Sequence, residues 1–328
     1  MVDLTTEYLG LKLKNPLIAG SSGLSATIKG VREFEENGAG AVVLKSIFEE
    51  EIMFEYEDIL REASQEGVNM DQFDYYDFEL KSGKIKKYTS LIEECKKNVS
   101  IPVIASINCV YSHEWTSFAK QLEEAGADAL ELNMFFLPSD FERTSEEKEK
   151  AYFRIIEKVQ KEVRIPIALK ISYYFSNLGP MIQNLSNTGV AGLVLFNRFY
   201  SPDFDIDKLE VVSSNVFSSP SDLTISLRWV GIMAERVNCD LAASTGVHDG
   251  VALIKQILAG ANAVQVVSAF YQHGKGHIAT MLATLEEWMK KKGFNSLSDF
   301  RGKLSQAKSS NPAVYERVQF MKYFGGAN

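Results

Sequence analysis

Residues 166–197 read PIALKISYYFSNLGPMIQNLSNTGVAGLVLFN and contain one complete structural repeat. The repeat begins with an apolar run, Pro166 to Leu169, that ends at Lys170, and it closes with a second run, Gly192 to Phe196, that ends at Asn197. Between the two runs, Pro180 to Thr188 has apolar residues at three- and four-residue spacing, which is typical of an amphipathic helix. A strand, a crossing helix and a further strand predict a parallel β-sheet.

The same arrangement recurs along the chain. Six more apolar runs start near a glycine or proline and precede a small, amide or cationic residue: 16–20, 41–44, 102–107, 129–132, 241–243 and 263–267. Glycine-containing turns precede several of them, and glycine tolerates the left-handed conformation that ends a helix. Eight strands separated by helices predict a (β/α)8 TIM barrel, in which the active site lies at the carboxyl ends of the strands.

The length of the chain is consistent with a single domain that carries insertions. A typical barrel has about 250 residues, so the 328 residues here predict a single domain over 1–328 with insertions. Two connections are too long for simple crossovers, about 47–99 and 198–228. We expect the first to form a helix plus a β-ribbon, with a turn at Ser82-Gly83, and the second to cap the barrel mouth from the other side. After the last strand, 278–292 predicts a helix with a solvated lysine end.

The composition excludes several classes of protein. With 45% hydrophobic and 24% charged residues, the chain has the composition of a soluble globular protein. A net charge of -8 disfavours binding to nucleic acid or to an acidic membrane surface. Cys95, Cys109 and Cys239 have no metal-ligand spacing, and no signal peptide or membrane span is expected. We therefore expect a cytoplasmic protein.

Metal binding is not expected. The four histidines, His113, His248, His273 and His277, show no metal-binding pattern, and each is interpreted as a surface or loop residue. No metal site is assigned.

Two lysines and three asparagines follow predicted strands. A cation at the position of Lys45 or Lys170 can hold an anionic ligand or a reduced cofactor, or a desolvated lysine can form a Schiff base. Asn108, Asn133 and Asn197 offer donors and acceptors that suit the imide edge of a heterocyclic ring. These residue types predict a small-molecule site at the barrel mouth.

Small residues follow the seventh and eighth strands. There, backbone N–H groups and a helix N-terminus commonly hold a phosphate group. The residues in question are Ser244, Thr245 and Gly246, and then Ser268 and Ala269. This part of the mouth is therefore a candidate phosphate site.

Together these motifs resemble the dihydroorotate dehydrogenase family, particularly its soluble class that contains FMN, over nearly the whole chain. The resemblance rests on residues 15–23, Leu44-Lys45-Ser46, Glu131-Leu132-Asn133, Ala168-Leu169-Lys170, Phe196-Asn197 and the closing segment 293–304. It implies hydride transfer from dihydroorotate or a related pyrimidine to FMN, and it implies a homodimer.

The resemblance also implies roles for individual residues. Lys45 and Lys170 would lie beside the isoalloxazine and take part in catalysis, and Ser244 to Gly246 with Ser268 and Ala269 would receive the phosphate. Ring or ribityl contacts are implied for Ala19, Ser21, Asn133 and Asn197. Asn108, Asn133 and Asn197 are the expected substrate contacts.

The chain departs from the family at the general base. The family's Asn-Leu-Ser-Cys-Pro-Asn is replaced by residues 133–140, which read NMFFLPSD. Phenylalanine and leucine cannot accept a proton, so Ser139 is the candidate base, with Asp140 as the alternative. The substrate loop is reduced to a trace at 67–70, and residues 218–221 replace a glycine-rich motif.

Two other functions remain open at this point. One is a flavin-free lyase that uses Lys170 or Lys45 as a Schiff-base nucleophile on a phosphorylated carbonyl compound. The other is an FMN-binding subunit without catalytic activity, which the missing base would explain.

Overall fold

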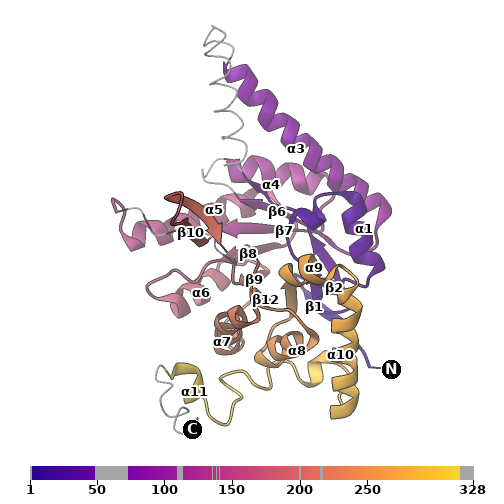
Figure 1. The fold of residues 1–328 in the computed structure, drawn as a ribbon. Coiled ribbons are helices and arrows are strands. Elements are labelled where there is room, and N and C mark those ends of the chain that lie inside the picture. The colour runs from indigo at the N-terminus through magenta and orange to yellow at the C-terminus, as the bar shows by residue number, and fades with distance from the viewer. Residues whose placement is uncertain are drawn as a thin grey trace.

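A closed parallel barrel surrounded by helices forms the body of the protein (Figure 1). The computed structural model describes residues 2–48, 73–108, 114–134, 136–137, 139, 141–198, 201–214 and 217–317. The eight barrel strands are β3 (Leu17–Ala19), β4 (Ala41–Val43), β6 (Val103–Asn108), β7 (Ala129–Met134), β8 (Ile167–Ile171), β9 (Gly192–Leu195), β12 (Asp240–Ser244) and β13 (Ala263–Val266). Each pairs in parallel with the next, and β13 pairs with β3, so the barrel is closed. The predicted TIM barrel is confirmed.

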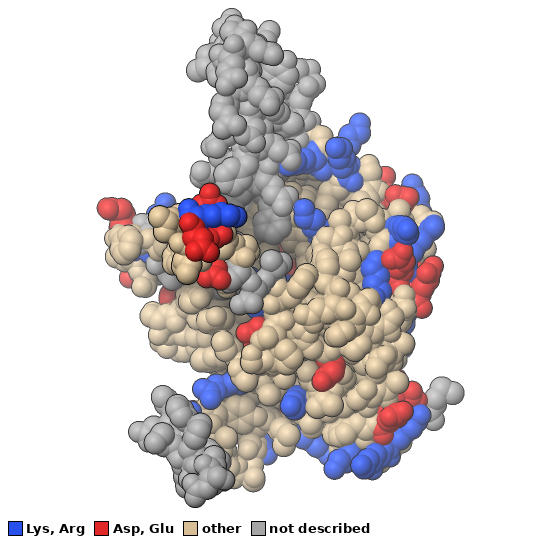
Figure 2. All heavy atoms as spheres, viewed as in Figure 1, with Lys and Arg blue, Asp and Glu red and all other residues tan. Residues whose placement is uncertain are grey.

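Helices connect the strands in the expected order. They are α1 (Ile28–Glu36), α3 (Phe73–Asn98), α4 (Glu114–Glu124), α5 (Ser145–Glu162), α6 (Leu178–Ser186), α7 (Leu223–Met233) and α8 (Gly250–Ala259), followed by α9 (Ser268–His273), α10 (His277–Lys292) and α11 (Ala313–Glu316). Gly293 ends α10 in the left-handed conformation, at φ 74°. Lys290 to Lys292 are exposed as predicted, and Figure 2 shows basic side chains gathered at the lower end of this helix. None of the described helices is long and apolar enough to cross a membrane.

The amino end of the barrel is filled by a short hairpin of β1 (Thr6–Tyr8) and β2 (Leu11–Leu13). Tyr8 and Leu9 pack inside against small residues of the strands, and the backbone N–H of Leu9 donates to the Asp240 carboxylate at 2.8 Å. Gly192 leaves room for this hairpin, since a Cβ atom there would lie 2.5 Å from Leu9 Cδ2 and would push that side chain aside. Because this hairpin fills the amino end, the barrel is open at the carboxyl ends of the strands.

The first insertion differs from the prediction. The described part has a short strand, β5 (Ile47–Phe48), and the single long helix α3, which projects from the body in Figure 1. The predicted turn at Ser82-Gly83 is wrong, since α3 continues through it. Buried Ile85, Tyr88, Ile92 and Cys95 follow at helical spacing, and burying this face outweighs the local turn signal. The rest of the expected ribbon, 49–72, lies outside the described residues.

The second insertion forms an antiparallel hairpin of β10 (Ser201–Asp205) and β11 (Glu210–Ser214). It is followed by a short 3-10 turn, Pro220–Asp222, and α7 then starts at Leu223, earlier than the predicted boundary of 228. Ser201 and Pro202, at the base of the hairpin, line a pocket next to Asn197. The insertion therefore lies at the barrel mouth.

Candidate functional site

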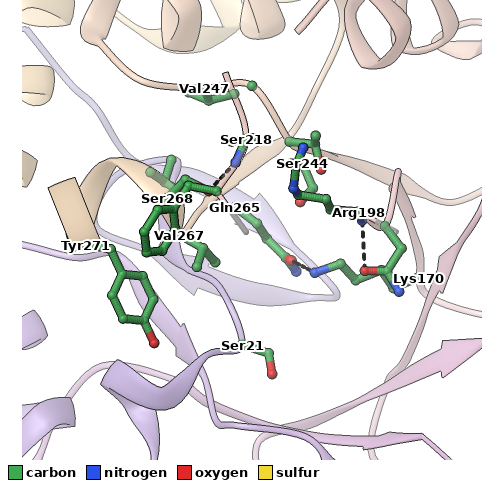
Figure 3. Close-up of a pocket in the computed structure, with 15 residues that line it drawn as sticks. Ser21, Lys170, Arg198, Ser218, Ser244, Val247, Gln265, Val267, Ser268 and Tyr271 are labelled. Atoms are coloured by element: carbon green, nitrogen blue, oxygen red, sulfur yellow. Dashed lines mark hydrogen bonds between the residues drawn. The ribbon is translucent and has the colours of Figure 1, made fainter. Parts of the chain in front are cut away.

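A cavity of ≈ 380 Å³ opens at the carboxyl ends of the strands (Figure 3). Its volume falls within the range of small-molecule sites. Seven residues singled out from the sequence line it: Ser21, Lys170, Asn197, Ser244, Thr245, Gly246 and Ser268. They follow or belong to five different strands, so the closure of the barrel brings them together.

Lys170 extends from β8 into the wall of this cavity, with its side chain 8% exposed. Its ammonium donates to Gln265 Oε1 at 2.9 Å, and the Gln265 amide nitrogen donates to the Glu131 carboxylate. Since an ammonium only donates and a carboxylate only accepts, the orientation of the Gln265 amide is fixed. Glu131 Oε1 also lies 3.8 Å from the ammonium.

Asn133 and Asn197 form a pair at the edge of the cavity. Asn197 Nδ2 donates to Asn133 Oδ1 at 2.5 Å, and the backbone N–H of Arg198 donates to Asn197 Oδ1 at 3.0 Å. Both side-chain carbonyl oxygens therefore accept a hydrogen bond from within the protein. Asn133 itself is buried and does not line the main cavity, but it is hydrogen-bonded to Asn197, which does.

The turn after β12 has an unusual backbone. Thr245 and Gly246 are both left-handed, at φ 75° and 78°, and the Thr245 hydroxyl donates to the Phe196 carbonyl at 3.1 Å. A Cβ atom on Gly246 would lie 2.0 Å from the backbone nitrogen of Leu223. Turns of this kind can present backbone N–H groups to an anion. Ser268 lies beside the turn, and its Oγ accepts from the backbone N–H of Ser218 at 2.9 Å.

His248 lies in a loop, as predicted, but it is buried beside the cavity rather than exposed on the surface. Its Nε2 lies 3.0 Å from the Ser218 hydroxyl, which lines the cavity. Burial lowers the pKa of the His248 imidazole. Its position two residues after Gly246 was the only sequence signal, and the direction of a loop side chain does not follow from position.

Arg198 was also missed by the sequence analysis. It lines the main cavity and an adjoining pocket of ≈ 320 Å³, and its Nη1 donates to Asp222 at 3.0 Å. Tyr173, Tyr174 and Phe196 also line the adjoining pocket. A guanidinium thus lies between two hollows, next to a candidate substrate residue.

Six candidate residues do not line the main cavity: Ala19, Lys45, Asn108, Asn133, Ser139 and Ala269. Ala19 and Ala269 are fully buried, and Ser139 is exposed. Asn108 is half-buried at the end of β6.

Lys45, half-buried after β4, adjoins a buried chain of hydroxyls. The chain begins at Ser21 in the cavity wall, whose Oγ is 3.0 Å from Ser46 Oγ. Ser46 Oγ is in turn 2.7 Å from Ser106 Oγ. This chain fixes the backbone next to Lys45 against the cavity wall.

Comparison with known proteins decides the family. The family model described as dihydroorotate dehydrogenase matches residues 3–289. The chain belongs to the dihydroorotate dehydrogenase family. It is accordingly an oxidoreductase of the dihydroorotate dehydrogenase type.

Several relatives of this dihydroorotate dehydrogenase family member match over most of its length. A Thermoplasma volcanium protein named dihydroorotate dehydrogenase B (NAD(+)), catalytic subunit, is 26% identical over 92% of this chain and 98% of its own length. A putative dihydroorotate dehydrogenase A (fumarate) of Aeropyrum pernix is 27% identical over 92% and 97%. A chloroplastic dihydropyrimidine dehydrogenase (NADP(+)) of Arabidopsis thaliana is 26% identical over 92% and 76%.

Proposed function

We propose that the protein binds FMN in the 380 Å³ cavity and oxidises the CH–CH bond of dihydroorotate or a related dihydropyrimidine. The observation that carries the proposal is the meeting of Lys170 and Asn197 with the Thr245-Gly246 turn in one cavity. A cation and amides at one side suit a flavin ring, and an anion-binding turn at the other suits its phosphate. The names of the relatives point to the same class of substrate.

The residues present fit FMN. The buried ammonium of Lys170 faces the cavity, where it can stabilise negative charge on a ring. Gly246 packs against the start of α7, where a Cβ atom would overlap the Leu223 backbone, and this contact holds the left-handed turn beside the cavity. Ser268 and Ser218 add hydroxyl groups beside it. The ring is therefore assigned to the Lys170 side and the phosphate to the Gly246 side.

FMN, when bound, accepts a hydride at its N5 atom. The protein side chains would orient the substrate, stabilise negative charge and remove the substrate proton. Asn133 and Asn197 would orient the imide edge of the pyrimidine, and Lys170 would hold negative charge near the flavin ring. Ser139 is the candidate that removes the substrate proton, and it would have to approach the substrate from its exposed position.

We further propose that the protein works as a homodimer in the cytoplasm. This proposal rests on the family resemblance and on the absence of a membrane-spanning helix among the described residues. Sedimentation of the purified protein tests the dimer.

Anaerobic mixing of the purified flavoprotein with dihydroorotate tests the reaction. Bleaching of the flavin absorbance is expected on mixing. A flavin that stays oxidised with dihydroorotate but bleaches with dihydrouracil would transfer the proposal to another dihydropyrimidine. A flavin reduced by neither would favour the FMN-binding subunit without catalytic activity.

The Schiff-base lyase is the less favoured alternative. Schiff-base lysines are typically activated in an apolar pocket or beside another cation, whereas Lys170 is hydrogen-bonded to Gln265 and lies 3.8 Å from the Glu131 carboxylate. Borohydride trapping with phosphorylated carbonyl compounds should yield no adduct at Lys170.

A further inference from the structure

Glu131 is a buried carboxylate just beneath the candidate site. It lies on β7, is 1% exposed and does not line the cavity. Its Oε2 accepts from Gln265, while Oε1 has no hydrogen-bond partner among the described residues and lies 3.8 Å from Lys170 Nζ. Burying a carboxylate with one oxygen left without a hydrogen bond costs free energy, so the presence of Glu131 here calls for an explanation.

Lys170 thus lies between two environments. On one side it lines the cavity, and on the other it is hydrogen-bonded to Gln265 and faces Glu131. Gln265 contacts both charged groups, so it fixes the ammonium relative to the carboxylate. The ammonium cannot act on a ligand independently of this second charge.

The charge of Glu131 also interacts electrostatically with other groups inside the barrel. Burial raises the pKa of the Tyr8 and Tyr88 phenols, and the Glu131 carboxylate adds to the rise in both cases. In an interior with a low dielectric constant, such interactions are stronger than in water.

We propose that Glu131 is a positioning residue that tunes the reduction potential of the bound flavin by offsetting part of the charge of Lys170. This inference rests on the proposed function, in which FMN occupies the cavity. Reduced flavin in such a site carries negative charge, so a positive potential favours it over the oxidised form. The Glu131 carboxylate behind Lys170 makes the electrostatic potential in the cavity less positive. This change lowers the redox midpoint potential of the flavin.

The direction in which the Glu131 charge shifts the flavin midpoint potential can be tested by substitution. Glu131→Gln keeps the size of the side chain and removes its charge, so the midpoint potential should rise. We expect the variant to bind reduced FMN about tenfold more tightly relative to oxidised FMN, which is about 30 mV for a two-electron couple. Gln265→Glu places a further carboxylate against Lys170 and should shift the potential the other way.

Two further variants show whether the effect runs through Lys170. Glu33→Gln is the matched control, since it removes the carboxylate from another lysine pair, with Lys275 at 2.7 Å, outside the cavity wall. It should leave the potential unchanged. In a Lys170→Met background, Glu131→Gln should no longer produce its full shift.

The midpoint potential is measured by equilibration with a reference dye, and circular dichroism confirms that each variant is folded. If wild-type protein binds FMN and Glu131→Gln has the wild-type potential, the inference is overturned while the proposed function stands. A full shift that persists in the Lys170→Met background also overturns it. Wild-type protein that takes up no FMN overturns the proposed function and this inference together.

Discussion

The side chains at the barrel mouth act through their neighbours. Lys170 is hydrogen-bonded to Gln265 and lies 3.8 Å from Glu131, and Asn197 donates to Asn133. A substitution at one of these positions therefore changes the position or charge of another. Ser139 differs from them, because it is exposed and its backbone N–H donates to the nearby Leu137 carbonyl at 2.8 Å.

Replacing Ser139 with alanine tests its role as the general base. Loss of a general base typically lowers a rate by about 10²- to 10⁴-fold, so Ser139→Ala should slow flavin reduction by dihydroorotate to that extent while FMN affinity stays unchanged. Stopped-flow absorbance measures the rate. Ser117→Ala, at an exposed position on α4, is the control. An unchanged rate in Ser139→Ala would assign the proton to another residue.

His248 predicts a dependence of stability on pH. Burial lowers the pKa of its imidazole below the ordinary value of about 6.5, while Ser218, Gln272 and the Asp222 charge raise it and the His273 charge lowers it. The unfolded chain therefore binds the proton more readily, so this contribution to stability is lost as pH falls from about 6.5 through the folded pKa.

Thermal unfolding at about pH 7.5 and pH 5.5 measures this contribution. The melting temperature of His248→Gln should fall less between the two values than that of wild-type protein. Equal losses in His248→Gln and wild-type protein would contradict the prediction.

At the scale of elements, the turn between β12 and α8 shapes the cavity. Thr245 and Gly246 are left-handed, and the Gly246 Cα faces the start of α7 so closely that a Cβ atom would overlap the Leu223 backbone. The contact joins two successive βα units where the phosphate is proposed to bind.

Gly246→Ala and Gly274→Ala form a matched pair. Both glycines have φ +78°, but a Cβ atom at Gly274 would have no neighbour within 4 Å. In Gly274→Ala, only backbone strain should lower the free energy of unfolding, by about 1–3 kcal/mol. Gly246→Ala should lower the free energy of unfolding by more, because its Cβ atom overlaps α7. Denaturant unfolding compares them, and equal losses would show that the turn can move away from α7.

At the scale of the whole molecule, the barrel explains which features the sequence predicts. Apolar runs and glycine turns are local signals, so all eight strands were predicted within a few residues. The turn at Ser82-Gly83 was wrong because burial of a helix face depends on the rest of the fold.

Partners across the barrel were not predictable in the same way. Lys170 and Gln265 are 95 residues apart, and Gln265 and Glu131 are 134 residues apart. Their contact depends on strand register and closure, which no local pattern contains. The residue types at the strand ends could be predicted, whereas Arg198 with Asp222 and His248 with Ser218 required coordinates.

The most direct test of the account is titration of the flavin-free protein with FMN, followed by flavin fluorescence, in wild-type protein and in Gly246→Ala. We predict that wild-type protein binds one FMN per chain, with the visible spectrum of a flavoprotein, and that Gly246→Ala binds it far more weakly. A wild-type protein that takes up no FMN, or folded variants that bind it equally well, would contradict the assignment of this cavity.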